Sequence, residues 1–198
     1  MNVHPMHPLL ARAAAVAAGI AAAVPAGHPL DAPTPCGEFD TRTLINHWVL
    51  YTSHGLEHRA LRTELPEELV ARDFTADTEW RSAYAAQLER AVAAWADPAV
   101  WEGDVDLGGS PAPATGIARM LVLELLLHGW DVARAVGGET AGVEVDGELA
   151  AVALEIVEEN AELYRQFAGF AEPVALPQDA SAWDRALAAS GRDPRWKA

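Results

Sequence analysis

The chain has 198 residues, 51% of them hydrophobic, with 14 Lys and Arg against 29 Asp and Glu, a formal net charge of −15. This length is enough for one well-buried core, and the acidic balance disfavours nucleic acid and acidic membrane surfaces as partners. Lys197 is the one lysine and Cys36 the one cysteine. Internal lysine chemistry, a disulfide framework and an all-cysteine zinc site are therefore excluded within one chain.

Long segments with a helical period lie between clusters of Gly, Pro and Asp, and strand alternation is nearly absent. Helices are predicted at about residues 8–23, 41–64, 78–96, 115–136, 147–167 and 180–189, with brief strands conceivable only at 104–107 and 142–145. Four long amphipathic helices pack best as a bundle. The prediction is an all-α four-helix bundle with additional short C-terminal helices, organised as a single domain over residues 1–198.

The first predicted helix lies in an Ala-rich apolar run, residues 11–24, that resembles the apolar core of a secretory signal. Arg12, at the start of that run, is the only strong positive charge near its N-terminal side, and Pro5 and Pro8 stand where a signal is normally basic. Alanine favours helix and proline favours a helix start, so a helix of the fold is the preferred interpretation. No other segment approaches the length of a membrane span. We therefore expect a cytoplasmic protein without membrane partners.

The second predicted helix carries a histidine on its apolar face. Asp40 or Thr41 is the expected N-cap, and His47 shares a face with Leu44 and the aromatic residues Trp48 and Tyr51. The interior of a helix bundle is the usual place for metal and ligand sites. His47 is thus placed where it could serve as a ligand.

The fourth predicted helix contains a carboxylate, Glu124, inside an otherwise apolar run. Burying an unpaired ionised carboxylate is costly, so Glu124 needs a partner. His128 lies four residues later, on the same helical face, as two ligands of one ion require. A divalent metal held by His47, Glu124 and His128 fits this pattern, with Asp131 either orienting His128 or binding a cosubstrate.

Spacing alone leaves alternatives open. Glu124 and His128 could simply hydrogen-bond in the core. His54 and His58 form a competing histidine pair on roughly the face of His47, but their polar surroundings favour a place at the cavity mouth. Cys36 precedes a helix N-terminus that could activate a thiol, although a small buried residue under a loop is the favoured interpretation.

Three motifs together resemble a known family. They are Thr34-Pro-Cys-Gly-Glu-Phe-Asp-Thr-Arg-Thr-Leu-Ile-Asn-His47, Glu124-Leu-Leu-Leu-His128-Gly-Trp-Asp131 and Gly191-Arg-Asp-Pro-Arg-Trp196. In order and spacing they resemble actinobacterial metal-binding relatives of mycothiol-dependent maleylpyruvate isomerase, within the DinB/YfiT-like superfamily. The resemblance implies a DinB-type bundle with a divalent ion, zinc or alternatively nickel, at His47, Glu124 and His128.

The resemblance also implies a use for the ion. Enzymes of this superfamily often activate a low-molecular-weight thiol, so we expect mycothiol as cosubstrate and a small electrophilic molecule as substrate. His54 and His58 are predicted pocket residues, and Trp130 and the aromatic residues of the second helix are expected to shape an apolar pocket. Isomerase activity itself is not carried over, because the full-length isomerase has an additional C-terminal domain that contributes to its substrate site.

Two other functions remain open at this stage. One is a metal-dependent hydrolase or isomerase that uses water and no thiol, with His54 or Asp131 as the base. The other is a non-catalytic module that binds a metal or small ligand. Two-helix interfaces are common in helix bundles, so a homodimer is the expected assembly.

Overall fold

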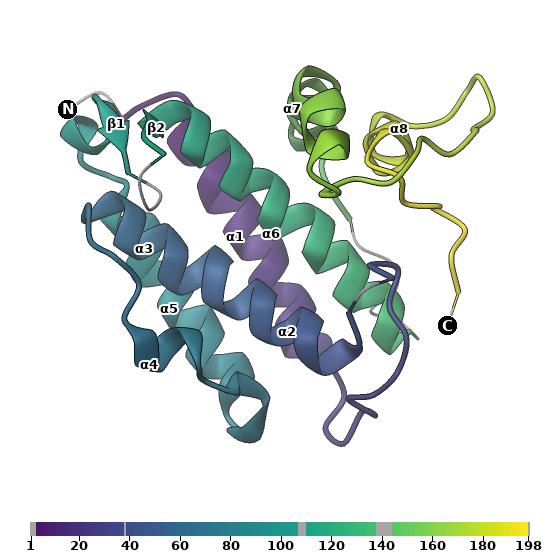
Figure 1. Ribbon diagram of the computed structural model, residues 1–198, viewed down its shortest axis with the longest axis horizontal. Helices are drawn as coiled ribbons and strands as arrows, with labels where there is room; N and C mark the ends of the chain where they lie inside the picture. Colours follow the sequence, from purple (N-terminus) through teal and green to yellow (C-terminus); the bar gives the residue numbers. More distant parts are fainter. Residues whose placement is uncertain (1–2, 38, 107–109, 138–143, 198) are drawn as a thin grey trace.

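The computed structural model describes residues 3–37, 39–106, 110–137 and 144–197. Four long helical segments run alongside one another and form the bundle (Figure 1). They are α1 (Met6–Ala23), the continuous run of α2 (Thr41–Val49), η1 (Leu50–His54) and α3 (Gly55–Ala60), α5 (Trp80–Ala94) and α6 (Ala114–Val136). The predicted all-α four-helix bundle is confirmed.

Short elements connect the bundle helices. They are α4 (Glu67–Val70), the 3₁₀ turns η2 (Phe74–Ala76) and η3 (Pro98–Trp101), and strands β1 (Asp104–Val105) and β2 (Ala112–Pro113). The strands pair antiparallel, with Asp104 opposite Pro113. The first predicted strand is therefore present in shortened form. The second, 142–145, lies largely outside the described residues, and its described part, 144–145, is not a strand.

Helix ends follow the local signals in the sequence. Asp40 is the N-cap of α2, where its carboxylate accepts a hydrogen bond from the Thr43 amide at 2.8 Å. At the same end of the bundle, α6 ends where Gly137 adopts a positive φ of 66°, a conformation that favours glycine. These two ends fix the start of the helix that carries His47 and the end of the helix that carries Glu124.

The second bundle helix departs from regular α-helical geometry at η1, a π-helical turn. The hydroxyls of Thr52 and Ser53 donate hydrogen bonds of 2.6 Å to the carbonyls of Trp48 and Val49, four residues earlier. Such bonds compete with main-chain bonding and distort helices. A π-turn holds more residues than an α-turn, so every side chain after it is rotated from the face that regular spacing predicts.

Close approach of α6 to its neighbours brings the histidine-bearing helices together. Gly129 faces the ring of Trp48, and a Cβ added there would lie 3.1 Å from Ile20 Cδ1 and 3.3 Å from Trp48 Cζ2. The Trp48 indole also donates a hydrogen bond to the Leu125 carbonyl, at 3.3 Å. The absence of a side chain at position 129 thus allows α1, α2 and α6 to meet one residue away from His128.

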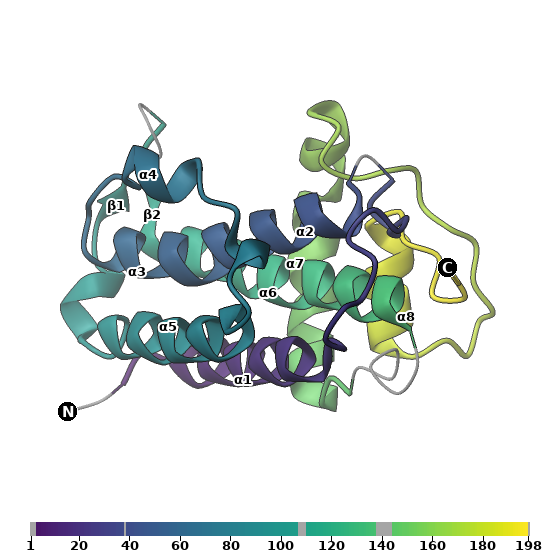
Figure 2. The same cartoon turned by 90° about the horizontal axis from the view of Figure 1, so that it is seen from below.

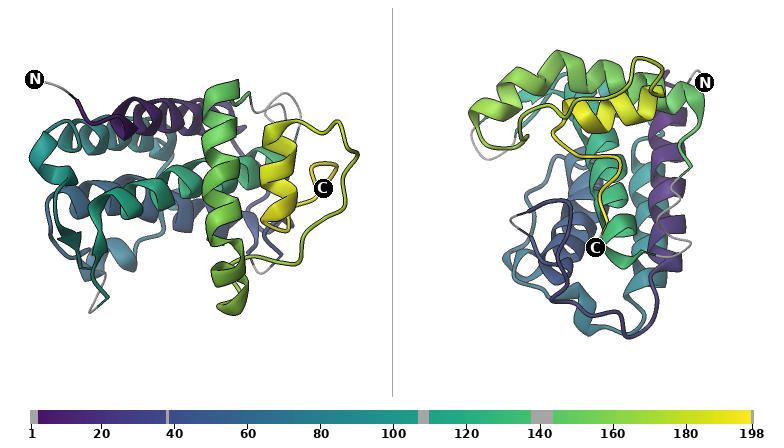
Figure 3. Two further views of the ribbon diagram at one scale, coloured as in Figure 1. Left: turned by 90° about the horizontal axis from the view of Figure 1, so that it is seen from above. Right: turned by 90° about the vertical axis from the view of Figure 1, so that its right-hand side faces the viewer.

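Two further helices, α7 (Gly147–Gln166) and α8 (Ala182–Ala189), pack on each other. They lie across one end of the bundle, as Figures 2 and 3 show from other directions. With 20 residues, α7 matches the helix predicted at 147–167, and α8 matches the short helix predicted at 180–189. The last residues of α7 and the loop after it reach over the site described below.

The Ala-rich first helix is α1, as predicted. By length and composition it is the one helix in the described part of the chain that could cross a membrane. A core helix near the N-terminus satisfies the same criteria, and Leu10, Ala17 and Ile20 of α1 are buried against α5 and α6. In this structure α1 is a bundle helix.

Candidate metal centre

The structure brings together the three residues predicted as ligands. His47 projects from α2, whereas Glu124 and His128 project from successive turns of α6. One ligand atom from each of the three lies within 4.8 Å of the others. Their side chains are 28%, 31% and 13% exposed, respectively, so all three are accessible from a cavity without being on the open surface.

The spacing of these atoms fits a metal ion better than it fits direct hydrogen bonds. Glu124 Oε2 lies 3.5 Å from His47 Nε2 and also 3.5 Å from His128 Nε2. Both distances exceed those of good hydrogen bonds. Tetrahedral coordination with bonds of about 2.0–2.1 Å places neighbouring ligand atoms about 3.4 Å apart. Two imidazoles and a carboxylate form a donor set suited to zinc-type ions and leave a fourth position for a ligand.

The orientation of His128 is fixed from behind by a buried carboxylate. His128 Nδ1 lies 3.0 Å from Asp131 Oδ2, and the Asp131 side chain is fully buried. Because an ionised carboxylate only accepts hydrogen bonds, Nδ1 carries the proton and Nε2 keeps its lone pair toward Glu124. A carboxylate that orients a histidine in this way is a common feature of metal sites.

Asp131 is in turn held by an arginine from near the end of the chain. Arg192 Nε donates to Asp131 Oδ1 at 2.9 Å, and Arg192 Nη2 donates to Oδ2 at 2.8 Å. Burial alone would raise the pKa of Asp131 and lower the pKa of Arg192, but their ion pair reverses both shifts. Asp131 therefore remains ionised, and the closing Gly191–Trp196 motif acquires a structural role through Arg192.

Glu124 is also held in its charged form. Burial alone would raise its pKa, but the contact with His47 and electrostatic interactions with His128, His47 and Arg192 outweigh that effect and lower it. An ionised carboxylate between two imidazoles is the protonation state that a cation requires.

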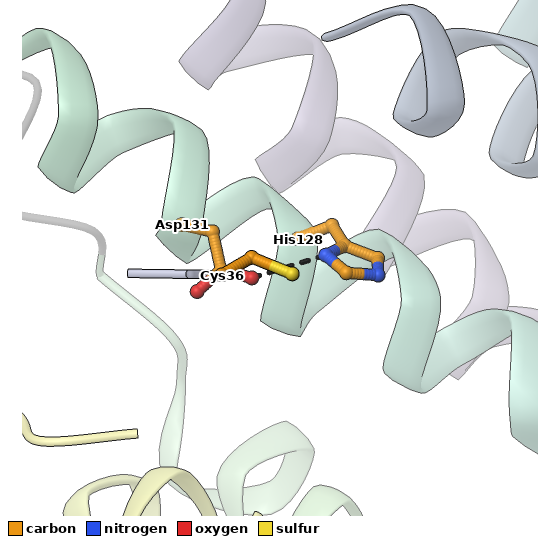
Figure 4. A group of neighbouring side chains, drawn as sticks. All are labelled: Cys36, His128 and Asp131. Carbon is orange, nitrogen blue, oxygen red and sulfur yellow. Dashed lines mark hydrogen bonds and ion pairs between the residues drawn. The ribbon is translucent and has the colours of Figure 1, made fainter. Parts of the chain in front are cut away.

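A second group of metal-ligand types overlaps this one. Cys36, His128 and Asp131 also place ligand atoms within 4.8 Å of one another, and Figure 4 shows Cys36 approaching the other two from the loop before α2. Both carboxylate oxygens of Asp131 already bind the guanidinium of Arg192, whose positive charge opposes a cation there. The donor set of His47, Glu124 and His128 is therefore the better fit. Cys36 is half-buried in the cavity wall, not a fully buried residue under the loop as expected.

The candidate metal centre opens into a cavity of about 370 Å³, within the range of small-molecule sites. Its lining is mostly apolar and aromatic. Around the three ligands it comprises Cys36, Phe39, Tyr51, Arg59, Met120, Leu121, Leu123, Leu127, Tyr164, Ala168, Gly169 and Phe170. The wall from Tyr164 to Phe170 belongs to the end of α7 and the following loop. The expected apolar pocket is therefore built partly by the C-terminal helices.

Four residues expected at the pocket lie elsewhere. His54 stacks on Phe74 with ring centroids 5.4 Å apart, and His58 Nδ1 lies 2.8 Å from Thr63 Oγ1. Neither lines the cavity, because the π-turn rotates this part of the helix away from the face of His47. Trp130 is buried outside the cavity lining, since two residues after His128 an α-helix faces the opposite side. Of the two aromatic residues expected there from the second helix, Tyr51 lines the cavity, whereas Trp48 is fully buried against α6 at Gly129.

Sequence reasoning missed Arg59, Arg192 and Tyr164. The same π-turn that removes His54 and His58 from the cavity brings Arg59 into it. Arg192 was quoted within a motif but given no role, and its partner Asp131 is 61 residues away. The paired hydroxyls of Thr52-Ser53 are the one local signal that could have indicated the irregular turn.

Comparison with protein families matches residues 9–133 of the chain to the mycothiol maleylpyruvate isomerase N-terminal domain. The matched segment extends from α1 into the last turn of α6 and includes His47, Glu124, His128 and Asp131. No curated protein and no solved structure matches the chain.

Proposed function

Because the chain belongs to the mycothiol maleylpyruvate isomerase N-terminal domain family, we propose that it is a metal-dependent, thiol-using enzyme. His47, Glu124 and His128 hold a divalent ion, zinc or alternatively nickel, and the substrate is a small electrophile. The family is DinB-like, mycothiol-associated and metal-binding; the ligand set, the thiol and the reaction are proposed for this chain. The single-domain organisation over residues 1–198 and a cytoplasmic location belong to the same proposal.

The observation that carries the proposal is the convergence of three neutral or anionic donors on one point at the floor of a cavity. His47 Nε2 and His128 Nε2 lie at equal distances of 3.5 Å from Glu124 Oε2. Asp131 leaves His128 with its free lone pair on the cavity side. Three protein ligands leave one position open, which is typical of catalytic and not of structural zinc sites.

The cavity supports a thiol as the additional ligand. A bound divalent ion lowers the pKa of a thiol that coordinates it, which supplies a thiolate near neutral pH. The described lining contains no second carboxylate besides Glu124 to serve as general base for a water nucleophile. Phe39, Tyr51 and Phe170 offer apolar surface that excludes water from the reacting groups. This lining favours thiol chemistry over hydrolysis.

The test is turnover of 1-chloro-2,4-dinitrobenzene by zinc-loaded protein, with and without mycothiol. Substitution of the thiol sulfur for chloride forms a carbon–sulfur bond and releases chloride and a proton, and the conjugate is measured by its absorbance. We expect conjugation above the uncatalysed rate that needs both zinc and mycothiol. It should be lost in Glu124→Gln but retained in Arg185→Gln, a surface charge change on α8.

Three outcomes would contradict the proposal. Zinc-dependent hydrolysis of a nitrophenyl ester without any effect of thiol, across a panel of electrophiles, would identify a hydrolase. Calorimetric binding of mycothiol without turnover of any electrophile in the panel would identify a binding module. Conjugation that is equally fast in wild type and Glu124→Gln would show that the activity does not depend on the metal centre.

A further inference from the structure

One charged side chain in the cavity has no role in holding the metal. Arg59, on α3, lines the cavity together with His47 and Glu124. Its Nε is buried and without a hydrogen-bond partner, and no ion pair to Arg59 is found within residues 3–37, 39–106, 110–137 and 144–197. Buried guanidinium groups are normally paired, because desolvating them is costly. An arginine in this condition indicates a missing anionic partner.

The sequence has ample acidic residues to pair an arginine. The chain has 29 Asp and Glu against 14 Lys and Arg, and Arg42, Arg119 and Arg192 each have a carboxylate partner within 3.1 Å. Arg59 instead feels only the longer-range field of Glu124 and Tyr51, which does not offset burial, so its pKa is lowered. The positive charge persists, since arginine stays protonated in proteins.

The backbone beneath Arg59 is shaped to hold its guanidinium. Gly55 lies one helical turn earlier, and a Cβ there would lie 2.5 Å from Arg59 Nη1. Glycine is unfavourable inside a helix, yet here its missing side chain leaves the space in which the guanidinium lies. The π-turn from Leu50 to His54 completes the arrangement by rotating Arg59 onto the cavity side.

We propose that Arg59, seated over Gly55, is a specificity-determining residue that binds a planar oxyanion, a carboxylate, on the molecule that enters the cavity. The inference rests on the proposed function, because it assumes that the other end of that molecule reaches the metal centre. Guanidinium and carboxylate match in geometry through two parallel hydrogen bonds. The cavity would therefore prefer a molecule with an anionic head and an apolar body over an uncharged analogue.

The test uses cobalt-loaded protein and two thiols, 3-mercaptopropionate and its uncharged analogue 3-mercaptopropionamide. Sulfur-to-cobalt charge-transfer absorption reports their binding to the ion. We expect the wild type to bind the acid about tenfold or more tightly than the amide. In Arg59→Gln this ratio should fall to about one or two, while affinity for the amide stays within about twofold.

Two further variants separate geometry from charge. Gly55→Ala keeps the charge of Arg59 but displaces its guanidinium, so the acid-to-amide ratio should fall although alanine favours the helix and thermal stability is kept. Arg185→Gln removes a distant positive charge and should leave the ratio at the wild-type value. If Arg185→Gln lowered the acid-to-amide ratio as much as Arg59→Gln, the preference for the acid would arise from the overall charge of the protein, and the proposal would be overturned.

A second titration removes the dependence on the ion. Metal-free protein is titrated with 3-phenylpropionate and 3-phenylpropionamide by calorimetry, and the acid should again bind more tightly in wild type but not in Arg59→Gln. Absence of any cobalt-thiol absorption would contradict the proposed function alone. An acid-to-amide ratio near one in both titrations, or one unchanged by Arg59→Gln, would overturn the carboxylate site and leave the metal centre untouched.

Discussion

Two regions around His128 differ in how their charged groups are paired, one behind it and one on its cavity side. Behind the metal centre, Asp131 binds Arg192 through two hydrogen bonds and His128 through a third. On the cavity side, Glu124 lies 3.5 Å from each histidine, and Arg59 has a buried nitrogen without a partner. The charged groups behind His128 are paired within the protein and stabilise the fold. The charged groups on the cavity side, Glu124 and Arg59, are not closely paired in this way within the described residues and are available to bind a ligand. Substitutions behind His128 should therefore lower the unfolding free energy, whereas substitutions on the cavity side should lower ligand affinity.

The largest effect is expected behind His128. Arg192→Ala leaves the fully buried Asp131 without its counter-charge, and loss of one partner of a buried ion pair costs about 3–5 kcal/mol of unfolding free energy. Urea denaturation of the metal-free protein measures this loss. Arg192→Ala/Asp131→Ala should lose less than the sum of the two single variants. If Arg192→Ala lowered the unfolding free energy by less than about 1 kcal/mol, as expected for a surface change such as Arg185→Gln, the buried ion pair would have no special role in stability.

The cavity side should show the reverse pattern. Glu124→Gln keeps the shape of the side chain but removes the charged donor, so zinc affinity should fall more than about 100-fold, beyond the loss expected for an outer-shell residue. Unfolding free energy without metal should change by less than about 1 kcal/mol. Competition with a chromogenic chelator and urea denaturation supply the two numbers. A large loss of unfolding free energy with unchanged zinc affinity would show that Glu124 stabilises the fold and does not bind the metal.

Asp131 links the two regions and should affect both. In Asp131→Asn the hydrogen bond to His128 loses its charge, and zinc affinity should fall about 10–100-fold, less than in Glu124→Gln. Chelator competition again provides the measurement. Zinc affinity equal to that of the wild type would show that orientation of His128 by Asp131 has no bearing on the metal.

The smallest effect concerns a paired charge that is exposed. Hydrogen bonds from Thr75, Asn46 and Arg42 lower the pKa of Asp73 from 3.8 to about 2. Since the folded-state pKa is the lower one, this stabilisation is complete above about pH 4 and is lost as the pH falls toward 2. Asp73 is 41% exposed, so screening limits the contribution to about 1 kcal/mol.

Comparison of unfolding free energies of wild type and Asp73→Asn across that pH window tests this prediction. The difference between the two proteins should be largest near pH 5 and vanish near pH 2. A difference independent of pH would assign the role of Asp73 to packing or neutral hydrogen bonds.

Periodicity and capping were sufficient to predict most of the fold and to place Glu124 and His128 on one helical face. Asp40, Gly137 and the i, i+4 pair of Glu124 and His128 act within one or two helical turns, where sequence spacing translates directly into position. Regular helical spacing gave wrong positions after Thr52, because the π-turn rotates the rest of the helix. As a result Arg59 lines the cavity, whereas His54 and His58 do not. Spacing also could not locate Arg192, since contacts between distant segments leave no local pattern.

The central claim is that His47, Glu124 and His128 bind one divalent ion. Crystals grown with zinc, with diffraction recorded above and below the zinc absorption edge, test it directly. The predicted result is one anomalous peak about 2.0–2.2 Å from His47 Nε2, His128 Nε2 and a Glu124 carboxylate oxygen. A peak beside Cys36 and Asp131 instead, or none at the floor of the cavity, would contradict it.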